Sequence, residues 1–209
     1  MAERYVITLG RECGAGATYI AQHLSKELGI PYYDKDIFRM VSDKSGVLEE
    51  FFHVNSERPG NNLLYKLVKD LKPADQKPSL GKDIVSPDNL FRFQSELIRE
   101  LADNESCIII GRCADYVLKD HDNCVHVFVC GDMDSKVQRM MHSYSLEESA
   151  AVERIKETDK QRKKYYSYYT GGDWEAASNY DLCLNTGDMS IEEAAEQILF
   201  YLKQEKNIF

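Results

Sequence analysis

The sequence predicts an α/β fold in three layers, with a parallel sheet of about five strands between helices. Short apolar runs rich in β-forming residues alternate with amphipathic helical patterns, which is typical of parallel sheets covered on both faces. A chain of 209 residues is long enough to bury the core of one such domain. The predicted strands are Tyr5–Leu9, Ile30–Tyr33, Cys107–Ile110, Val125–Cys130 and Asp181–Asn185.

The predicted helices are recognised by apolar residues that recur every three or four positions. In the first helix, Ile20, Leu24 and Leu28 fall on one face, and Gly29 follows as a stop signal. The helical patterns cover Tyr19–Leu28, Asp36–Val41, Leu63–Leu71, Asn89–Leu101, Met133–Met141, Leu146–Tyr169 and Ile191–Leu202.

Two helical stretches without strands interrupt the alternation and are interpreted as insertions in a single domain. They cover residues 43–103 and 142–175. Within the first, Lys72–Pro87 combines prolines, a glycine and lysines, and is predicted to be a mobile loop. The remaining core comprises residues 1–42, 104–141 and 176–209.

The composition restricts the partners of this protein. A net charge of −9 argues against nucleic acid or an anionic membrane surface as the main partner. No apolar run reaches the ~20 residues that span a bilayer, and the first residues lack the pattern of a signal peptide, so we expect a cytoplasmic protein. Small phosphorylated ligands remain compatible, because local N–H groups and arginines can bind them whatever the net charge.

The turn after the first predicted strand has the pattern of a phosphate-binding loop. It reads Gly10-Arg-Glu-Cys-Gly-Ala-Gly-Ala-Thr18, between a strand and a helix. The N–H groups of such a turn and the dipole of the helix bind polyphosphate. The predicted nucleotide-binding residues are Gly14, Ala15, Gly16, Ala17 and Thr18. The alternative is a glycine-rich turn that binds no ligand.

One residue of this loop departs from the usual pattern GxxxxGK[ST]. In that pattern the lysine contacts the outer phosphates and the hydroxyl contacts Mg²⁺. Thr18 supplies the hydroxyl, but Ala17 stands where the lysine belongs. Arg11 lies in the same loop and is predicted to supply the missing charge.

The segments around this loop resemble the cytidylate-kinase-like family of P-loop nucleoside monophosphate kinases. Gly14-Ala-Gly-Ala-Thr18 is followed by Leu28-Gly-Ile-Pro-Tyr-Tyr-Asp34. These segments are similar to the family's P-loop and to its "YLDTGAMYR" segment, in which Asp34 and Arg39 match the Asp and the Arg. The resemblance implies that both bind the acceptor and that Arg39 holds its monophosphate.

Two later segments extend the resemblance. The run that ends in Gly111-Arg112 is similar to the family's "GRDxGTxV" segment, which implies that Arg112 binds the acceptor. Cys113 replaces the Asp that reads cytosine, and Asp115 lies two residues too late to be equated with it. In the segment that resembles the lid, Asp159 and Arg162 match residues that close over the phosphates. They are therefore predicted, with Arg11, to be catalytic.

The resemblance implies ATP-dependent phosphoryl transfer to a nucleoside monophosphate, either cytidylate (CMP or dCMP) or a related small acceptor. ATP and Mg²⁺ would be the cofactors, with Mg²⁺ on the Thr18 hydroxyl. Residues 43–103 would form the monophosphate-binding insertion and residues 142–175 the lid of a P-loop NTPase-type fold.

Two other functions stay open. One is a nucleotide-binding module without kinase activity, because the P-loop lysine and the base-reading Asp are missing. The other is phosphoryl transfer to a quite different acceptor on the same fold. The aromatic residues of Tyr165–Tyr169 and Trp174 are predicted to pack a helix against the core or a second subunit, or to stack on a base. A homodimer is compatible with the packing on a second subunit.

Overall fold

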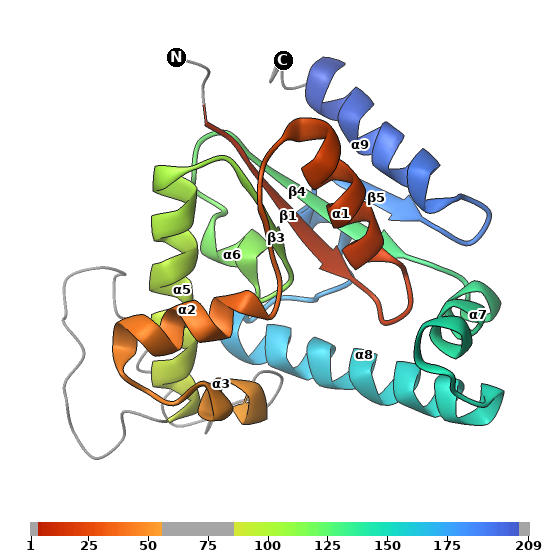
Figure 1. Ribbon diagram of the computed structural model, residues 1–209, viewed down its shortest axis with the longest axis horizontal. Coiled ribbons are helices and arrows are strands. Elements are labelled where there is room, and N and C mark those ends of the chain that lie inside the picture. Colours follow the sequence, from red (N-terminus) through yellow and green to blue (C-terminus); the bar gives the residue numbers. More distant parts are fainter. Residues whose placement is uncertain (1–3, 56–85, 205–209) are drawn as a thin grey trace.

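A parallel sheet of five strands, in the order β2-β3-β1-β4-β5, runs through the centre of the molecule (Figure 1). The computed structural model describes residues 4–55 and 86–204. Every neighbouring pair of strands is parallel. The strands are β1 (Val6–Arg11), β2 (Tyr32–Tyr33), β3 (Cys107–Ile110), β4 (Cys124–Cys130) and β5 (Leu182–Asn185).

Helices cover both faces of the sheet and complete the three layers. The helices are α1 (Ala17–Leu28), α2 (Asp36–Ser45), α3 (Glu49–Asn55), α5 (Pro87–Asn104), α6 (Ala114–Val117), α7 (Met133–Tyr144), α8 (Glu148–Thr170) and α9 (Ile191–Gln204), with a short 3-10 helix at Ala177–Asn179. Helices α1 and α9 pack on one face, and α2, α5 and α6 pack on the other.

Alternation along the strands explains these two apolar layers. In β1, Ile7 and Leu9 face α1 and α9, whereas Val6 faces α5 and α2. In β3, Ile108 faces α1 and α9, and Ile109 faces the layer of α2 and α5. Both faces of a buried parallel strand are apolar, so β3 reads as a continuous apolar run in the sequence, whereas β1 and β4 include polar residues such as Thr8 and His126.

The predicted α/β fold with a five-stranded parallel sheet is confirmed, and each predicted strand overlaps an observed one. The predicted starts of the two insertions fall inside helices, since α2 continues past residue 42 and α7 past residue 141. Leu63–Leu71 and almost all of the predicted loop Lys72–Pro87 lie outside the described residues. Within the described ranges, no helix has the length and apolar character needed to cross a membrane.

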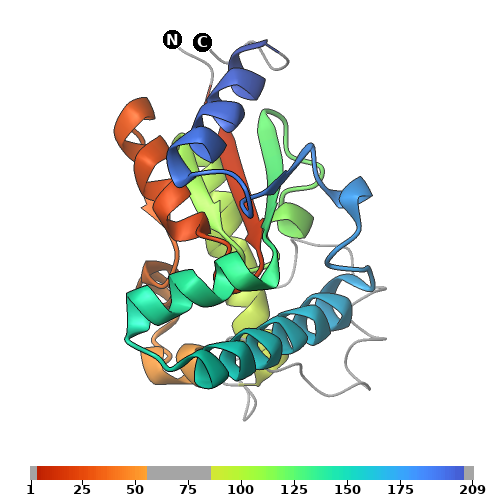
Figure 2. The same ribbon diagram turned by 90° about the vertical axis from the view of Figure 1, so that its right-hand side faces the viewer.

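Helix α8 lies across the carboxyl ends of the central strands (Figures 1 and 2). It is held there partly by α7, which packs on it through Val137, Met140, Ala151 and Ile155. The loop between β1 and α1 also ends at this edge. Turns from several strands therefore meet in the space between the sheet and α8, which is where ligands bind in open α/β sheets.

Candidate functional site

The loop between β1 and α1, residues 12–16, is here called the glycine loop, and its shape requires glycine at two positions. Gly14 and Gly16 have φ angles of 81° and 87°, which residues with a Cβ rarely adopt. A Cβ on Gly14 would lie 2.9 Å from the carbonyl oxygen of Lys136, and one on Gly16 would overlap Ile191. The glycine loop is therefore tightly enclosed by α7 and by the start of α9.

The N-terminus of α1 at the end of this loop is suited to an anion. Gly16 is the N-cap, and no side chain caps the helix. The first N–H groups of a helix have no partner within it, and the helix dipole adds positive potential at this end. Thr18 is exposed on the first turn, so its hydroxyl is accessible to a ligand, whereas Ala17 is buried in the apolar core.

A carboxylate from α8 already occupies part of the glycine loop. The N–H of Cys13 donates to Asp159 Oδ1 at 2.7 Å. Two cations flank the same carboxylate, with Lys136 Nζ 3.7 Å from Oδ2 and Arg162 Nη1 3.9 Å from Oδ1. Burial raises the pKa of Asp159, while the Cys13 N–H and the two cations act in the opposite direction. The glycine loop thus holds an anion in this structure.

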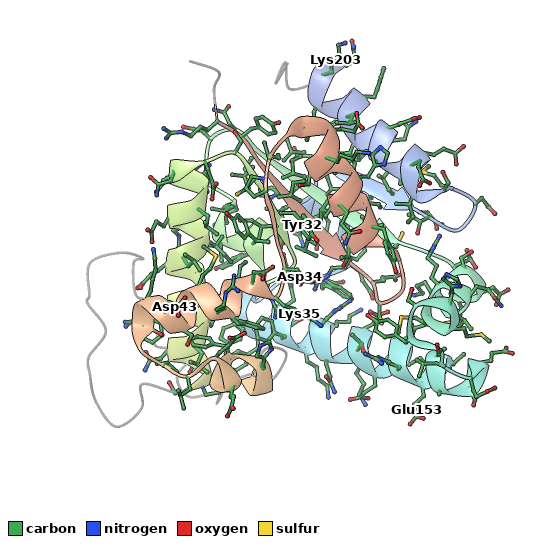
Figure 3. All side chains as sticks on the ribbon, viewed as in Figure 1. Tyr32, Asp34, Lys35, Asp43, Glu153 and Lys203 are labelled. Atoms are coloured by element: carbon green, nitrogen blue, oxygen red, sulfur yellow. The ribbon has the colours of Figure 1, made fainter. Side chains whose placement is uncertain are left out.

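A second cluster of charges joins the ends of β1, β2 and β3. Asp34, at the end of β2, lies between the sheet and α8 (Figure 3). Its Oδ1 is 3.7 Å from Arg11 Nη2 and 3.9 Å from Arg112 Nη2. Arg112 also stacks on Phe38, with its guanidinium carbon 4.0 Å from the ring centroid. Strands β2, β3 and β1 are neighbours in the sheet, so the turns that follow them meet.

The turn after β3 is strained. Gly111, Arg112 and Cys113 have φ angles of 68°, 61° and 52°, so three successive residues are left-handed and two of them carry a Cβ. Such conformations cost free energy and cluster at functional sites. The guanidinium of Arg11 lies directly over Gly111, where an added Cβ would displace it. This turn therefore sets the positions of both arginines.

A pocket of about 30 Å³ lies between these turns and α8. Buried Asp115 lines it from α6, and the Tyr166 hydroxyl donates to Asp115 Oδ2 at 2.7 Å. Burial raises the pKa of Asp115, and the hydrogen bond from Tyr166 opposes this shift. The other lining residues are Gly10, Arg11, Gly111, Arg112, Cys113, Arg162, Tyr165, Tyr166 and Trp174.

A wider and more open groove lies on the other side of the glycine loop. It has a volume of about 800 Å³ and runs between α1, α7 and the start of α9. Arg139 and Ile191 line it and also stand close to Gly16. Arg139 Nη1 donates to the carbonyl oxygen of Gly14 at 3.2 Å. The groove therefore continues directly from the glycine loop.

The structure brings most of the predicted site residues together. The five predicted nucleotide-binding residues form the glycine loop and the first turn of α1, with Asp159 and Arg162 on α8 above them. Arg162 also donates to the carbonyl oxygen of Arg11 at 3.2 Å. Arg39 lies apart, with its side chain 67% exposed on α2 and 4.0 Å from Asp36.

Three side chains of the site were missed by the sequence reasoning. Lys136 and Arg139 reach the glycine loop from α7, and Thr186 Oγ1 donates to the carbonyl oxygen of Ala15 at 2.9 Å. In the sequence, Lys136 and Arg139 are polar residues of a predicted helix, and Thr186 follows the last predicted strand. None of them belongs to a recognisable motif. Tyr165, Tyr166 and Trp174 pack with Cys113 and Phe128, so the predicted packing of this aromatic cluster against the core is confirmed.

We predict that Gly111→Ala lowers the free energy of unfolding by about 0.5–1 kcal/mol more than Gly29→Ala, because the new Cβ must push the end of the flexible Arg11 side chain away from Asp34. The two glycines have similar φ angles, 68° and 65°, so both substitutions carry the same backbone strain. Only at position 111 does the new Cβ overlap a side chain, that of Arg11, since nothing lies within 4 Å at Gly29. Urea unfolding of both variants measures the difference, and equal losses would contradict the prediction.

We predict that Asp115→Asn gains stability relative to wild type as the pH rises from 4 to 7. Burial raises the pKa of folded Asp115 above its ordinary value of 3.8. Ionising the buried carboxyl of Asp115 costs free energy in the folded protein. The wild type therefore loses stability as the pH rises from the pKa of the unfolded chain through the pKa of the folded protein. Urea unfolding at several pH values tests this, with exposed Asp120→Asn as a control for net charge. A constant or falling difference would refute it.

Comparison with known proteins identifies the family of this chain. The cytidylate kinase-like family model matches residues 6–188. A cytidylate kinase of Methanobrevibacter smithii is 24% identical over 199 residues, covering 95% of this chain and 98% of the relative. A cytidylate kinase of Methanopyrus kandleri is 26% identical over 198 residues, covering 90% of this chain and 88% of the relative.

Solved structures share the fold. An uncharacterised protein from Eubacterium ventriosum superposes with a TM-score of 0.69 at 26% identity, over 97% of this chain and 100% of that chain. Shikimate kinase from Bacteroides thetaiotaomicron superposes with a TM-score of 0.54 at 14% identity, over 95% of this chain and 98% of that chain. The predicted resemblance is confirmed, because the family model covers most of the chain. The chain belongs to the cytidylate kinase-like family.

Proposed function

We propose that this protein transfers a phosphoryl group from ATP to a nucleoside monophosphate, with cytidylate (CMP or dCMP) as the acceptor. The observation that carries this proposal is the position of Arg162. Its guanidinium lies 3.9 Å from Asp159 at the glycine loop, and it also lines the pocket that holds Arg11 and Arg112. One cation thus stands between an anion-binding loop and an arginine-rich pocket.

The glycine loop is the proposed site of the donor phosphates. Its N–H groups and the uncapped N-terminus of α1 supply donors for phosphate oxygens. The open groove beside Gly16 has room for the nucleoside of ATP. The exposed Thr18 hydroxyl fits Mg²⁺, which when bound neutralises charge on the donor phosphates.

The pocket on the other side of Arg162 is the proposed site of the acceptor's phosphate, and it has to widen from about 30 Å³ to admit the whole nucleotide. Arg112 and Arg11 can hold the phosphate of the acceptor, and Asp34 keeps both guanidinium groups in place. Asp115, held by Tyr166, faces the same pocket and can accept a hydrogen bond from the acceptor. Arg39 joins this site only if α2 moves, since its side chain is exposed in this structure.

The proposed reaction requires these residues to position the two substrates and to neutralise the negative charge of the phosphates. Phosphoryl transfer needs no covalent intermediate with the protein, and its transition state carries negative charge on the transferred group. Arg162 lies where that charge would develop, and Asp159 orients Arg162 from the preceding turn of α8. The relatives named as cytidylate kinases support cytidylate as the acceptor.

A screen of acceptors tests the proposed reaction. Purified protein with Mg²⁺ and ATP is expected to convert CMP or dCMP to the diphosphate, faster than it converts UMP, AMP or non-nucleotide acceptors. Formation of ADP and of the phosphorylated product should be equal. Binding of ATP without transfer to any acceptor would favour the nucleotide-binding module, and a faster non-nucleotide acceptor would overturn the proposed substrate.

We predict that Arg112→Lys lowers kcat/KM for the acceptor by about 10- to 100-fold, while the KM for ATP changes less than about two-fold. A lysine has no planar fork to bind two phosphate oxygens or to stack on Phe38. Steady-state kinetics with each substrate varied in turn measures the effect. Arg4→Lys is the matched control, because Arg4 binds the carbonyl oxygen of Asp103 at the amino end of β1. Equal losses for both substrates would remove Arg112 from the acceptor site.

A further inference from the structure

Residue 17, the first residue of α1 directly after the glycine loop, is an alanine and carries no positive charge. Ala17 is 3% exposed and packs in the core formed by α1, α9 and the sheet. Arg11, the cation closest in sequence, is directed elsewhere. Its guanidinium covers Gly111 and pairs with Asp34 at 3.7 Å, on the side of the arginine-rich pocket. A charge at the loop itself must therefore come from another element.

Lys136, in the first turn of α7, provides a buried cation beside the loop. Its backbone lies against Gly14, where an added Cβ would be 3.2 Å from the Lys136 Cα. Its side chain is only 7% exposed, and Nζ lies 2.9 Å from Glu12 Oε2. Within residues 4–55 and 86–204, it is the one lysine that is buried. Burial of a lysine is costly unless its charge is paired, so this placement has to be held by strong partners.

The carboxylate of Asp159 marks where an anion sits relative to this lysine. Asp159 accepts the N–H of Cys13 at 2.7 Å and lies between Lys136 Nζ at 3.7 Å and Arg162 Nη1 at 3.9 Å. A backbone N–H, a lysine and an arginine are the groups that bind a phosphate oxygen. The side chain of Asp159 therefore occupies a position with the partners of a phosphate.

We propose that Lys136 supplies the cation that residue 17 does not, and that it contacts the outer phosphates of ATP when these displace Asp159 from the Cys13 N–H. This proposal rests on the proposed function, since it assigns a residue to the donor site. It makes Lys136 a catalytic residue that reaches the loop from α7 and forms no covalent bond. It also assigns Glu12 as the counter-ion of Lys136, which competes with the phosphates of the nucleotide for this lysine.

The test is calorimetric titration of the full-length protein with ATP and with AMP, both in the presence of Mg²⁺. Lys136→Met is expected to raise the Kd for ATP by about 10- to 100-fold, the loss of one contact to a charged group. The Kd for AMP is expected to stay the same, because AMP has no outer phosphates. Lys136→Arg should restore most of the ATP affinity. Lys203→Met, an exposed lysine at the end of α9 far from the loop, is the control (Figure 3).

A second variant keeps the test valid if Lys136→Met unfolds the protein by leaving Glu12 unpaired. The double variant Glu12→Gln with Lys136→Met removes both charges, and it is expected to show the same selective loss of ATP affinity. Glu12→Gln alone removes a carboxylate that competes with phosphate for Lys136. It should therefore bind ATP more tightly than wild type, whereas a purely structural ion pair predicts weaker binding.

The outcomes separate this proposal from the proposed function. If wild type binds ATP and the double variant binds it equally well, Lys136 has no part in the donor site and the proposal fails while the function stands. The same holds if ATP and AMP affinity fall together in the double variant. If wild type binds no ATP at all, the proposed function fails, and the role of Lys136 fails with it.

Discussion

The central place of β1 in the sheet is the constraint on which the site depends. β1 is hydrogen-bonded to β3 on one side and to β4 on the other, with Ile7 opposite both Ile108 and Val125. The carboxyl ends of parallel strands lie at the same edge of the sheet, so the turns that follow the strands meet there. The glycine loop, Asp34 and the turn at Arg112 follow three neighbouring strands and are far apart in the sequence. Their proximity follows from strand order alone.

The two charge clusters at this edge are balanced differently. Asp34 is the shared partner of two arginines, Arg11 and Arg112, so the charge cluster at the arginine-rich pocket has an excess of positive charge. At the glycine loop, Lys136 and Arg162 face Glu12 and Asp159 and neutralise them, while Arg139 binds the carbonyl oxygen of Gly14. The attraction of that loop for an anion therefore comes from backbone N–H groups, the dipole of α1 and Arg139 until a carboxylate leaves. An acidic protein can bind phosphate in this way without a basic surface.

Local patterns were enough to predict the fold and the glycine loop, and the family resemblance added Asp34, Arg112, Asp159 and Arg162. The strands are short runs of mostly apolar residues, and the glycine loop was recognised because it stands between a strand and a helix. Asp34 and Arg112 follow strands directly, so strand order brings them together. Lys136 and Asp115 gave no such signal, because their importance depends on which helix packs over the loop. A lysine on an amphipathic helix is usually exposed, and only tertiary packing buries this one.

The hydrogen bond between Thr186 and Ala15 has a consequence for how the protein is made. Thr186 Oγ1 donates to the carbonyl oxygen of Ala15, and the side chain is fully buried. The two residues are separated by 171 positions. During synthesis, the ribosome therefore adds Thr186 long after Ala15 of the glycine loop. Contacts of such long range form late in folding. A chain synthesised only as far as β4 therefore carries the sequence of the glycine loop without the hydrogen bond that Thr186 makes to it.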